Sequence, residues 1–244
     1  MSQAFATNLK CLVATLVLSV IVVFSADSPK VYLEGKLPGE LNKLDHKYEK
    51  YDYRKLHRET MLPAFKTAAK QDKIPYIRKY AGEIDQLLKK NQLIIAYTLS
   101  FCRNTHRKPI EVMPNVQAQT AWIDNKNSGS KKPAIMIFLP AFDREFTALK
   151  PAQLKDLFLT IIIHEYRHIT KQQNFSEDTP YPLVVASEAQ IWEEQLKEMF
   201  PAMKKAGRYL QPGIENHMAA YKQLKTRHPS QWLSYVRKNI AYPQ

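Results

Sequence analysis

The sequence predicts an α+β fold that is mostly helical, with a small antiparallel sheet placed before a long apolar helix. Apolar residues keep helical spacing through residues 37–108 and again through 201–244. Two short apolar runs, residues 110–124 and 134–139, flank a polar turn. Strands joined by such a turn form a hairpin, and we expect 134–139 to be its edge strand, with an interior strand as the alternative. With 45% hydrophobic residues, the chain is long enough for one packed domain or for two lobes around a cleft.

The first 26 residues have the layout of a secretory signal peptide. A polar start with one positive charge precedes a mostly apolar stretch at 11–24, and the small residues Ser25 and Ala26 follow. We expect cleavage after Ser25 or Ala26 and export to the periplasm or the cell exterior. Fourteen helical residues cover about 21 Å, less than a hydrocarbon core of about 30 Å, so an uncleaved membrane anchor is the weaker alternative. Cleavage leaves only Cys102, and hence no intramolecular disulfide.

Residues 27–244 then form one domain in three parts. Residues 27–108 make a basic, helical N-terminal part, in which Tyr76 to Cys102 reads as one helix after Pro75. The sheet and the helices of the candidate site occupy 109–200. Residues 201–244 read as C-terminal helices, with boundaries at Pro212-Gly213 and Pro229.

Charge narrows the choice of partners. The chain carries a formal net charge of +13, and residues 30–108 hold eighteen Lys and Arg against nine Asp and Glu. Such a surplus favours anionic partners, such as a cell-envelope or membrane surface. Export argues against nucleic acid, and the sequence does not indicate an oligomeric state.

The motif with the most chemical content is His164-Glu165-Tyr166-Arg167-His168. On a helix, residues four apart lie roughly 40° from one another on one face, so His164 and His168 can reach one metal ion. Glu165 would lie beside a metal-bound water and take its proton. The apolar residues before the motif and Pro151 predict a buried helix from about 148–152 to Gln172. Satisfied core histidines are the alternative for either residue alone.

A catalytic zinc site needs a third protein ligand, and Glu188 is the best candidate. It interrupts the apolar start of a predicted helix at 183–196, where an unpaired charge would be costly. We expect Glu193 and Glu194 to face solvent and Glu177 and Asp178 to serve the connecting loop. Arg167 either pairs with a carboxylate behind the metal helix or lies exposed.

These residues resemble the gluzincin type of zinc metallopeptidase, the thermolysin-like arrangement. The resemblance covers about 25 residues and implies a zincin-like domain, Zn²⁺ as cofactor, and His164, His168 and Glu188 as its ligands. It also implies that Glu165 is the general base of peptide-bond hydrolysis. Thermolysin-like enzymes place an aspartate one turn after the third ligand, and here Trp192 stands there. The orienting group must therefore come from elsewhere, for example a backbone carbonyl.

The sequence leaves two points open. An oxyanion needs one donor besides zinc, and His217, Tyr209 and Tyr221 are the candidates, although each also fits a structural role. The rival to an exported peptidase is a non-catalytic, exported, basic binding protein with no zinc or with a closed structural site, for example with His217 as fourth ligand.

Overall fold

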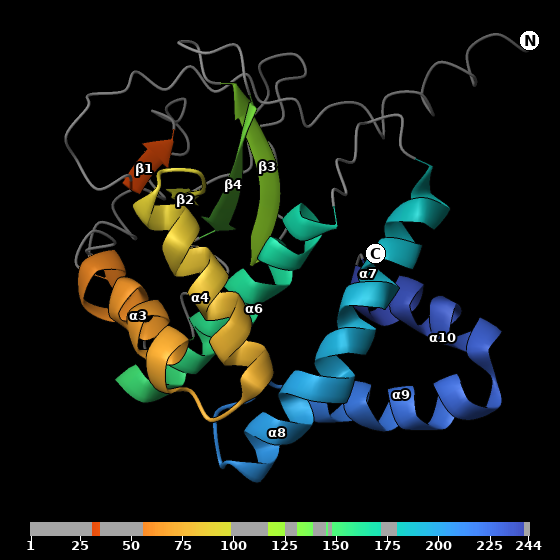
Figure 1. The fold of residues 1–244 in the computed structure, drawn as a ribbon. Coiled ribbons are helices and arrows are strands. Elements are labelled where there is room, and N and C mark those ends of the chain that lie inside the picture. The colour runs from red at the N-terminus through yellow and green to blue at the C-terminus, as the bar shows by residue number, and fades with distance from the viewer. Residues whose placement is uncertain are drawn as a thin grey trace, which may run out of the picture.

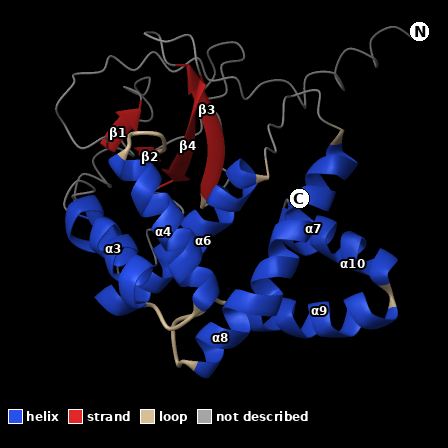
Figure 2. Ribbon diagram, viewed as in Figure 1, coloured by secondary structure: helices blue, strands red, loops and turns tan. Residues whose placement is uncertain are grey.

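The computed structural model describes residues 31–34, 56–98, 117–124, 131–138, 145, 148–171 and 180–241. Four strands gather at one end of the molecule, and helices make up the rest (Figures 1 and 2). The strands are β1 (Val31–Glu34), β2 (Ile94–Thr98), β3 (Ala118–Asp124) and β4 (Lys131–Phe138). The α-helices are α3 (Leu62–Gln71), α4 (Pro75–Lys89), α6 (Pro151–Thr170), α7 (Tyr181–Glu194), α8 (Phe200–Lys205), α9 (Ile214–Arg227) and α10 (Pro229–Val236). The π-helical turns are η1 (Leu56–Met61), η3 (Gln195–Met199) and η4 (Arg237–Ala241).

The α+β class and the predominance of helices are confirmed, but the sheet is mixed rather than antiparallel. Its order is β1-β2-β4-β3. The predicted hairpin is present, because β3 and β4 pair antiparallel with Thr120 opposite Ile135. Both β1–β2 and β2–β4 pair in parallel. The prediction of residues 134–139 as an edge strand is wrong and the alternative of an interior strand holds, since β4 lies between β2 and β3. Its side chains from Ala134 to Ile137 are all buried, as expected of a strand covered on both faces.

The strand β2 is the main departure from the expected N-terminal helices. The predicted helix from Tyr76 to Cys102 ends at Lys89, and β2 begins five residues later. Asn91 adopts a positive φ of 57°, a conformation that asparagine tolerates and that ends a helix. Three other predicted helix starts are confirmed, since Pro75, Pro151 and Pro229 each open a helix.

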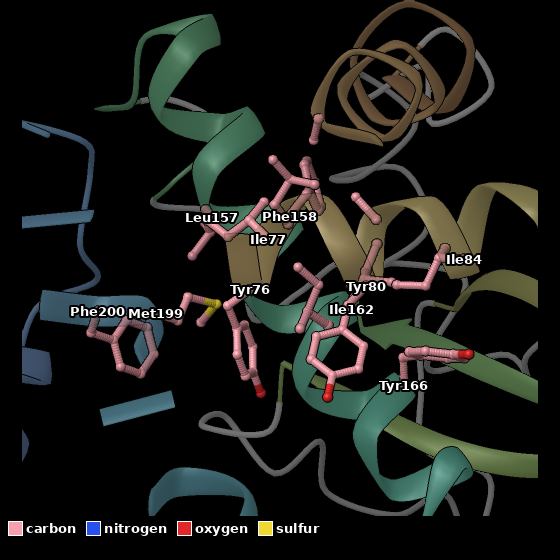
Figure 3. Packing of buried hydrophobic residues seen from close by; sticks show 14 of the residues in the cluster. Tyr76, Ile77, Tyr80, Ile84, Leu157, Phe158, Ile162, Tyr166, Met199 and Phe200 are labelled. Carbon is pink, nitrogen blue, oxygen red and sulfur yellow. The ribbon is translucent and has the colours of Figure 1, made fainter. Parts of the chain in front are cut away.

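The core forms where α4 and α6 pack together. Figure 3 shows their side chains in contact, with two further residues arriving from the chain after α7. The labelled members are Tyr76, Ile77, Tyr80 and Ile84 of α4, Leu157, Phe158, Ile162 and Tyr166 of α6, and Met199 and Phe200. Helix α6 also contacts β3, β4 and α7, so it joins the sheet to the C-terminal helices. Among the described helices, none has the length and apolar character needed to cross a membrane.

Candidate metal centre

Helix α6 presents the motif residues from a well-anchored position. Pro151 opens the helix, and the backbone N–H of Lys150 donates to Oε1 of Gln153 at 2.9 Å, which closes its first turn. Buried residues such as Phe158 and Ile162 hold it in the core. The helix runs to Thr170, so His164 and His168 lie on successive turns of one continuous element.

Helix α7 packs against α6 and brings Glu188 to both histidines. Oε2 of Glu188 lies 3.2 Å from Nε2 of His164, and Oε1 lies 3.1 Å from Nε2 of His168. The side chain of His168 is 8% exposed and that of Glu188 20% exposed. The structure therefore brings together the three side chains expected as ligands, and their donor atoms all lie within 4.8 Å of one another. Within the described ranges, this is the one such group of three or more His, Cys, Asp or Glu residues.

The electrostatics of this group favour a cation. Burial lowers the pKa of His164, but the hydrogen bond and the charge of Glu188 outweigh it and raise that pKa to about 9. Burial raises the pKa of Glu188, but hydrogen bonds from the two histidines outweigh this and hold it far below its usual range. The field that favours a proton on His164 would favour any cation held between these three side chains.

The donor set and its spacing fit a divalent metal ion. Two imidazole nitrogens and a carboxylate are ligands that zinc accepts. Donors about 2.0–2.1 Å from a tetrahedral centre lie about 3.3–3.4 Å apart, close to the observed 3.1 and 3.2 Å. The group of His164, His168 and Glu188 could thus bind a metal ion.

Each histidine has a partner at its other ring nitrogen. Nδ1 of His164 lies 2.9 Å from Oε1 of Gln195, and Nδ1 of His168 lies 3.5 Å from Oγ of Ser187. The Nδ1 partners of both histidines are therefore side chains, not the backbone carbonyl that the sequence analysis gave as an example. Trp192, at the aspartate position of the thermolysin-like pattern, packs its ring against His164 at 5.5 Å between centroids.

Sequence reasoning missed Gln195, although one signal could have revealed it. Seven α-helical residues amount to about two turns, so Gln195 falls on nearly the same face as Glu188. Sequence reasoning also missed Thr120, which no motif marks.

Glu165 lies beside the group and is held by β3. The hydroxyl of Thr120 lies 3.0 Å from Oε2 of Glu165 and 2.9 Å from its backbone carbonyl oxygen. Only 9% of Glu165 is exposed. The expected general base therefore has a hydroxyl partner, and its charge contributes to the raised pKa of His164.

Arg167 forms an ion pair with a carboxylate, which was one of the two alternatives that the sequence offered for it. Its Nε and Nη2 donate to Oε2 of Glu194 at 2.9 and 2.8 Å, and Lys171 contacts the other oxygen at 2.7 Å. The expectation that Glu193 and Glu194 face solvent is wrong, because both carboxylates are about three-quarters covered. Glu193 pairs with Lys225. The cationic partners come from α6 and its C-terminal end for Glu194 and from α9 for Glu193.

Each of the three candidate oxyanion donors has a described contact outside the candidate metal centre. His217 packs on Trp192, whose ring also contacts His164, and Nδ1 of His217 lies 2.8 Å from the Tyr235 hydroxyl oxygen. Tyr221 packs on Trp232, and the backbone N–H of Tyr209 donates to Asp156. His217 is likewise not part of the described metal-binding group. Residues 1–26, Cys102, Glu177 and Asp178 lie outside the described residues.

No family model matches this chain, and neither a search of curated proteins nor one of solved structures found a match.

Proposed function

We propose that this chain is an exported zinc metallopeptidase that hydrolyses peptide bonds. The observation that carries the proposal is the meeting of His164, His168 and Glu188 beside the buried Glu165. Three protein ligands are the number typical of a catalytic zinc site, in which the fourth position belongs to water or substrate.

The residues divide the chemistry between them. When bound, Zn²⁺ supplies a Lewis acid that polarises a carbonyl group and lowers the pKa of water. Glu165 takes a proton from the attacking water and later gives it to the leaving amine. Thr120 holds the carboxylate of Glu165 through its hydroxyl. Arg167 stabilises the packing of α6 against α7 through its ion pair with Glu194.

The position of β3 supports an extended peptide as the substrate. Among the described strands, β3 is the outer strand on the side of the sheet away from β1 and β2. Its residue Thr120 contacts Glu165, so this edge lies beside the proposed base. An extended peptide pairs with such an edge through backbone hydrogen bonds, which would carry its carbonyl groups past Glu165.

Two parts of the proposal rest on the sequence alone. The apolar stretch at residues 11–24 supports export. The net charge of +13 supports an anionic envelope or membrane surface as the place of action.

The test combines metal analysis with a proteolysis assay, with and without a chelator. We expect about one zinc per purified chain and cleavage of an unfolded protein substrate that the chelator abolishes. Glu165→Gln should keep the zinc and lose roughly 10²- to 10⁴-fold in rate, because it removes the base and spares the ligands. Protein without stoichiometric metal would refute the proposal and favour the non-catalytic binding protein.

A further inference from the structure

Gln195 is almost completely buried between the two helices of the site. Only 1% of it is exposed. It is the first residue of η3, the π-helical turn that follows α7. Such turns inside helices are frequently found at functional sites. The side-chain amide has a partner at each end: Oε1 lies 2.9 Å from Nδ1 of His164, and Nε2 lies 3.4 Å from the carbonyl oxygen of Thr160.

The chemistry of these partners fixes which atom donates at each contact. A backbone carbonyl only accepts, so the NH₂ group of Gln195 must face Thr160. Its oxygen then faces His164, and an amide oxygen also only accepts. Nδ1 of His164 must therefore carry a hydrogen. In a neutral imidazole this leaves the lone pair on Nε2, the nitrogen that lies 3.2 Å from Glu188.

We propose that Gln195 is a positioning residue that holds His164 with its proton on Nδ1 and directs the Nε2 lone pair at the metal ion. The inference rests on the proposed zinc site and extends it. One helix and its continuation then supply both a ligand, Glu188, and the group that orients another ligand.

A neutral amide distinguishes this arrangement from a carboxylate partner. An anionic acceptor draws the Nδ1 proton more strongly and makes the imidazole a stronger donor to the metal. The amide of Gln195 orients the ring without adding a negative charge to a site that already holds Glu165 and Glu188. Replacing the amide by a carboxylate of the same length should therefore keep or tighten zinc binding.

The experiment measures the zinc affinity of the full chain by competition with a chromogenic chelator. Gln195→Met removes both hydrogen bonds at similar length and should weaken binding about 10- to 100-fold, the usual effect of losing such a partner. Gln195→Glu keeps the acceptor and should bind at least as tightly as the parent. The matched control is Gln190→Met, at an exposed position of α7, and its affinity should equal that of the parent.

A second measurement needs no variant of Gln195. Histidine-selective ¹⁵N labelling of the zinc-bound parent should show the His164 ring with a hydrogen on Nδ1 and the metal on Nε2, the assignment being made by loss of the signal in His164→Asn. Metal coordination through Nδ1 would overturn the proposal. Circular dichroism of the metal-free variants checks that each remains folded.

The outcomes separate this inference from the proposed function. A parent protein without zinc refutes the zinc peptidase itself. A parent that binds zinc, together with Gln195→Met of unchanged affinity, refutes only the role of Gln195. Zinc binding by Gln195→Glu that is as weak as binding by Gln195→Met would also refute the role of Gln195, because a hydrogen-bond acceptor at this position would then have no effect.

Discussion

Glu188 is the residue on which the candidate metal centre most depends. Its carboxylate is four-fifths covered on a helix whose neighbouring positions include the buried Val185, Ala189 and Ile191. Burying a charge there is costly unless it is compensated. The compensation comes from His164 and His168, which contact one carboxylate oxygen each.

Glu188→Ala should therefore abolish stoichiometric zinc binding, with an affinity loss greater than the roughly 100-fold upper range for residues that only orient ligands. The loss is larger because a direct ligand disappears and two imidazoles remain. Equilibrium dialysis against zinc provides the measurement. Glu193→Ala on the same helix is the control, since Glu193 pairs with Lys225 instead of the histidines. Parent-like zinc affinity in Glu188→Ala would show that the third ligand is another residue.

At the scale of elements, ion pairs join α6 to α7 outside the candidate metal centre as well as within it. Arg167 lies in α6, and Lys171 directly follows its last residue. Both contact Glu194 of α7. The Arg167 guanidinium also lies 4.6 Å from the centre of the Tyr80 ring, which links the pair to α4. This network holds together the two helices that carry the three candidate ligands.

The network predicts a pH dependence of stability. Burial raises the pKa of Glu194, but Lys171 and Arg167 outweigh it and lower that pKa below its ordinary value of 4.5. A carboxyl group with a lower pKa in the folded state stabilises the protein above its unfolded pKa, and this stabilisation is lost as the pH falls toward the folded pKa. As the pH falls below about 5, the parent should therefore lose more stability than Glu194→Gln. Urea midpoints measured across that range, in chelator, provide the test.

Glu198→Gln serves as the control for this comparison, because it removes the same charge from an exposed position near the same helix end. Parallel curves for the parent and Glu194→Gln would contradict the assignment of acid sensitivity to this network.

A second ionic link connects α6 to the turn between α8 and α9. Arg208 donates to Asp72 at 2.6 Å and to Asp156 at 2.8 Å through Nε, and the side chain is one-fifth exposed. Arg208→Met would leave two largely covered carboxylates, Asp72 and Asp156, without this cationic partner, while each keeps a backbone N–H donor. Breaking a fully buried pair costs about 3–5 kcal/mol, and partial exposure reduces the expected loss of unfolding free energy to about 2–3 kcal/mol.

Denaturant unfolding should distinguish this variant from Lys204→Met. The pair of Lys204 with Glu215 is well over half exposed, and such pairs contribute about 1 kcal/mol or less. Equal losses in the two variants would show that burial does not set the strength of these links.

The sequence predicts an element well when the residues that determine it lie within that same segment of the chain. Helix α6 was predictable because proline, apolar periodicity and the motif all act within one segment, and the helix begins at Pro151 as expected. The strand β2 was not, because Ile94–Thr98 is a short apolar run whose period fits helix or strand. Its parallel partners β1 and β4 are distant in sequence, and that pairing leaves no local pattern.

The same distinction applies to the site. His164, Glu165 and His168 share one motif, and Glu188 stood out as a charge in an apolar segment. Thr120 and Glu194 acquire their contacts only when β3 and α7 pack against α6, so nothing near them in sequence marks those contacts. The expected exposure of Glu194 failed for this reason, since burial of a helix face depends on which element packs there.

At the scale of the whole molecule, the candidate metal centre lies where two groups of helices meet. On one side, α6 packs on the sheet and on α4, and on the other, α7 packs on α10 and η4. Figure 1 shows α7 running beside α10 toward α8, while α6 lies with α3 and α4. A metal ion held by both α6 and α7 would therefore act as a cross-link between the two groups.

Zinc should consequently raise the thermal stability of the entire chain. A ligand that binds only the folded state at 100 times its Kd adds about 2.7 kcal/mol. For a chain of this size each kcal/mol raises Tm by about 2–4 °C, so the expected rise is about 5–10 °C and a chelator should reverse it. The rise should be absent in Glu188→Ala, which lacks the ligand from α7. A rise of the same size in that variant would show that zinc stabilises the protein at a different place. A parent that binds zinc with its Tm unchanged would show that zinc binds the unfolded chain as tightly as the folded one.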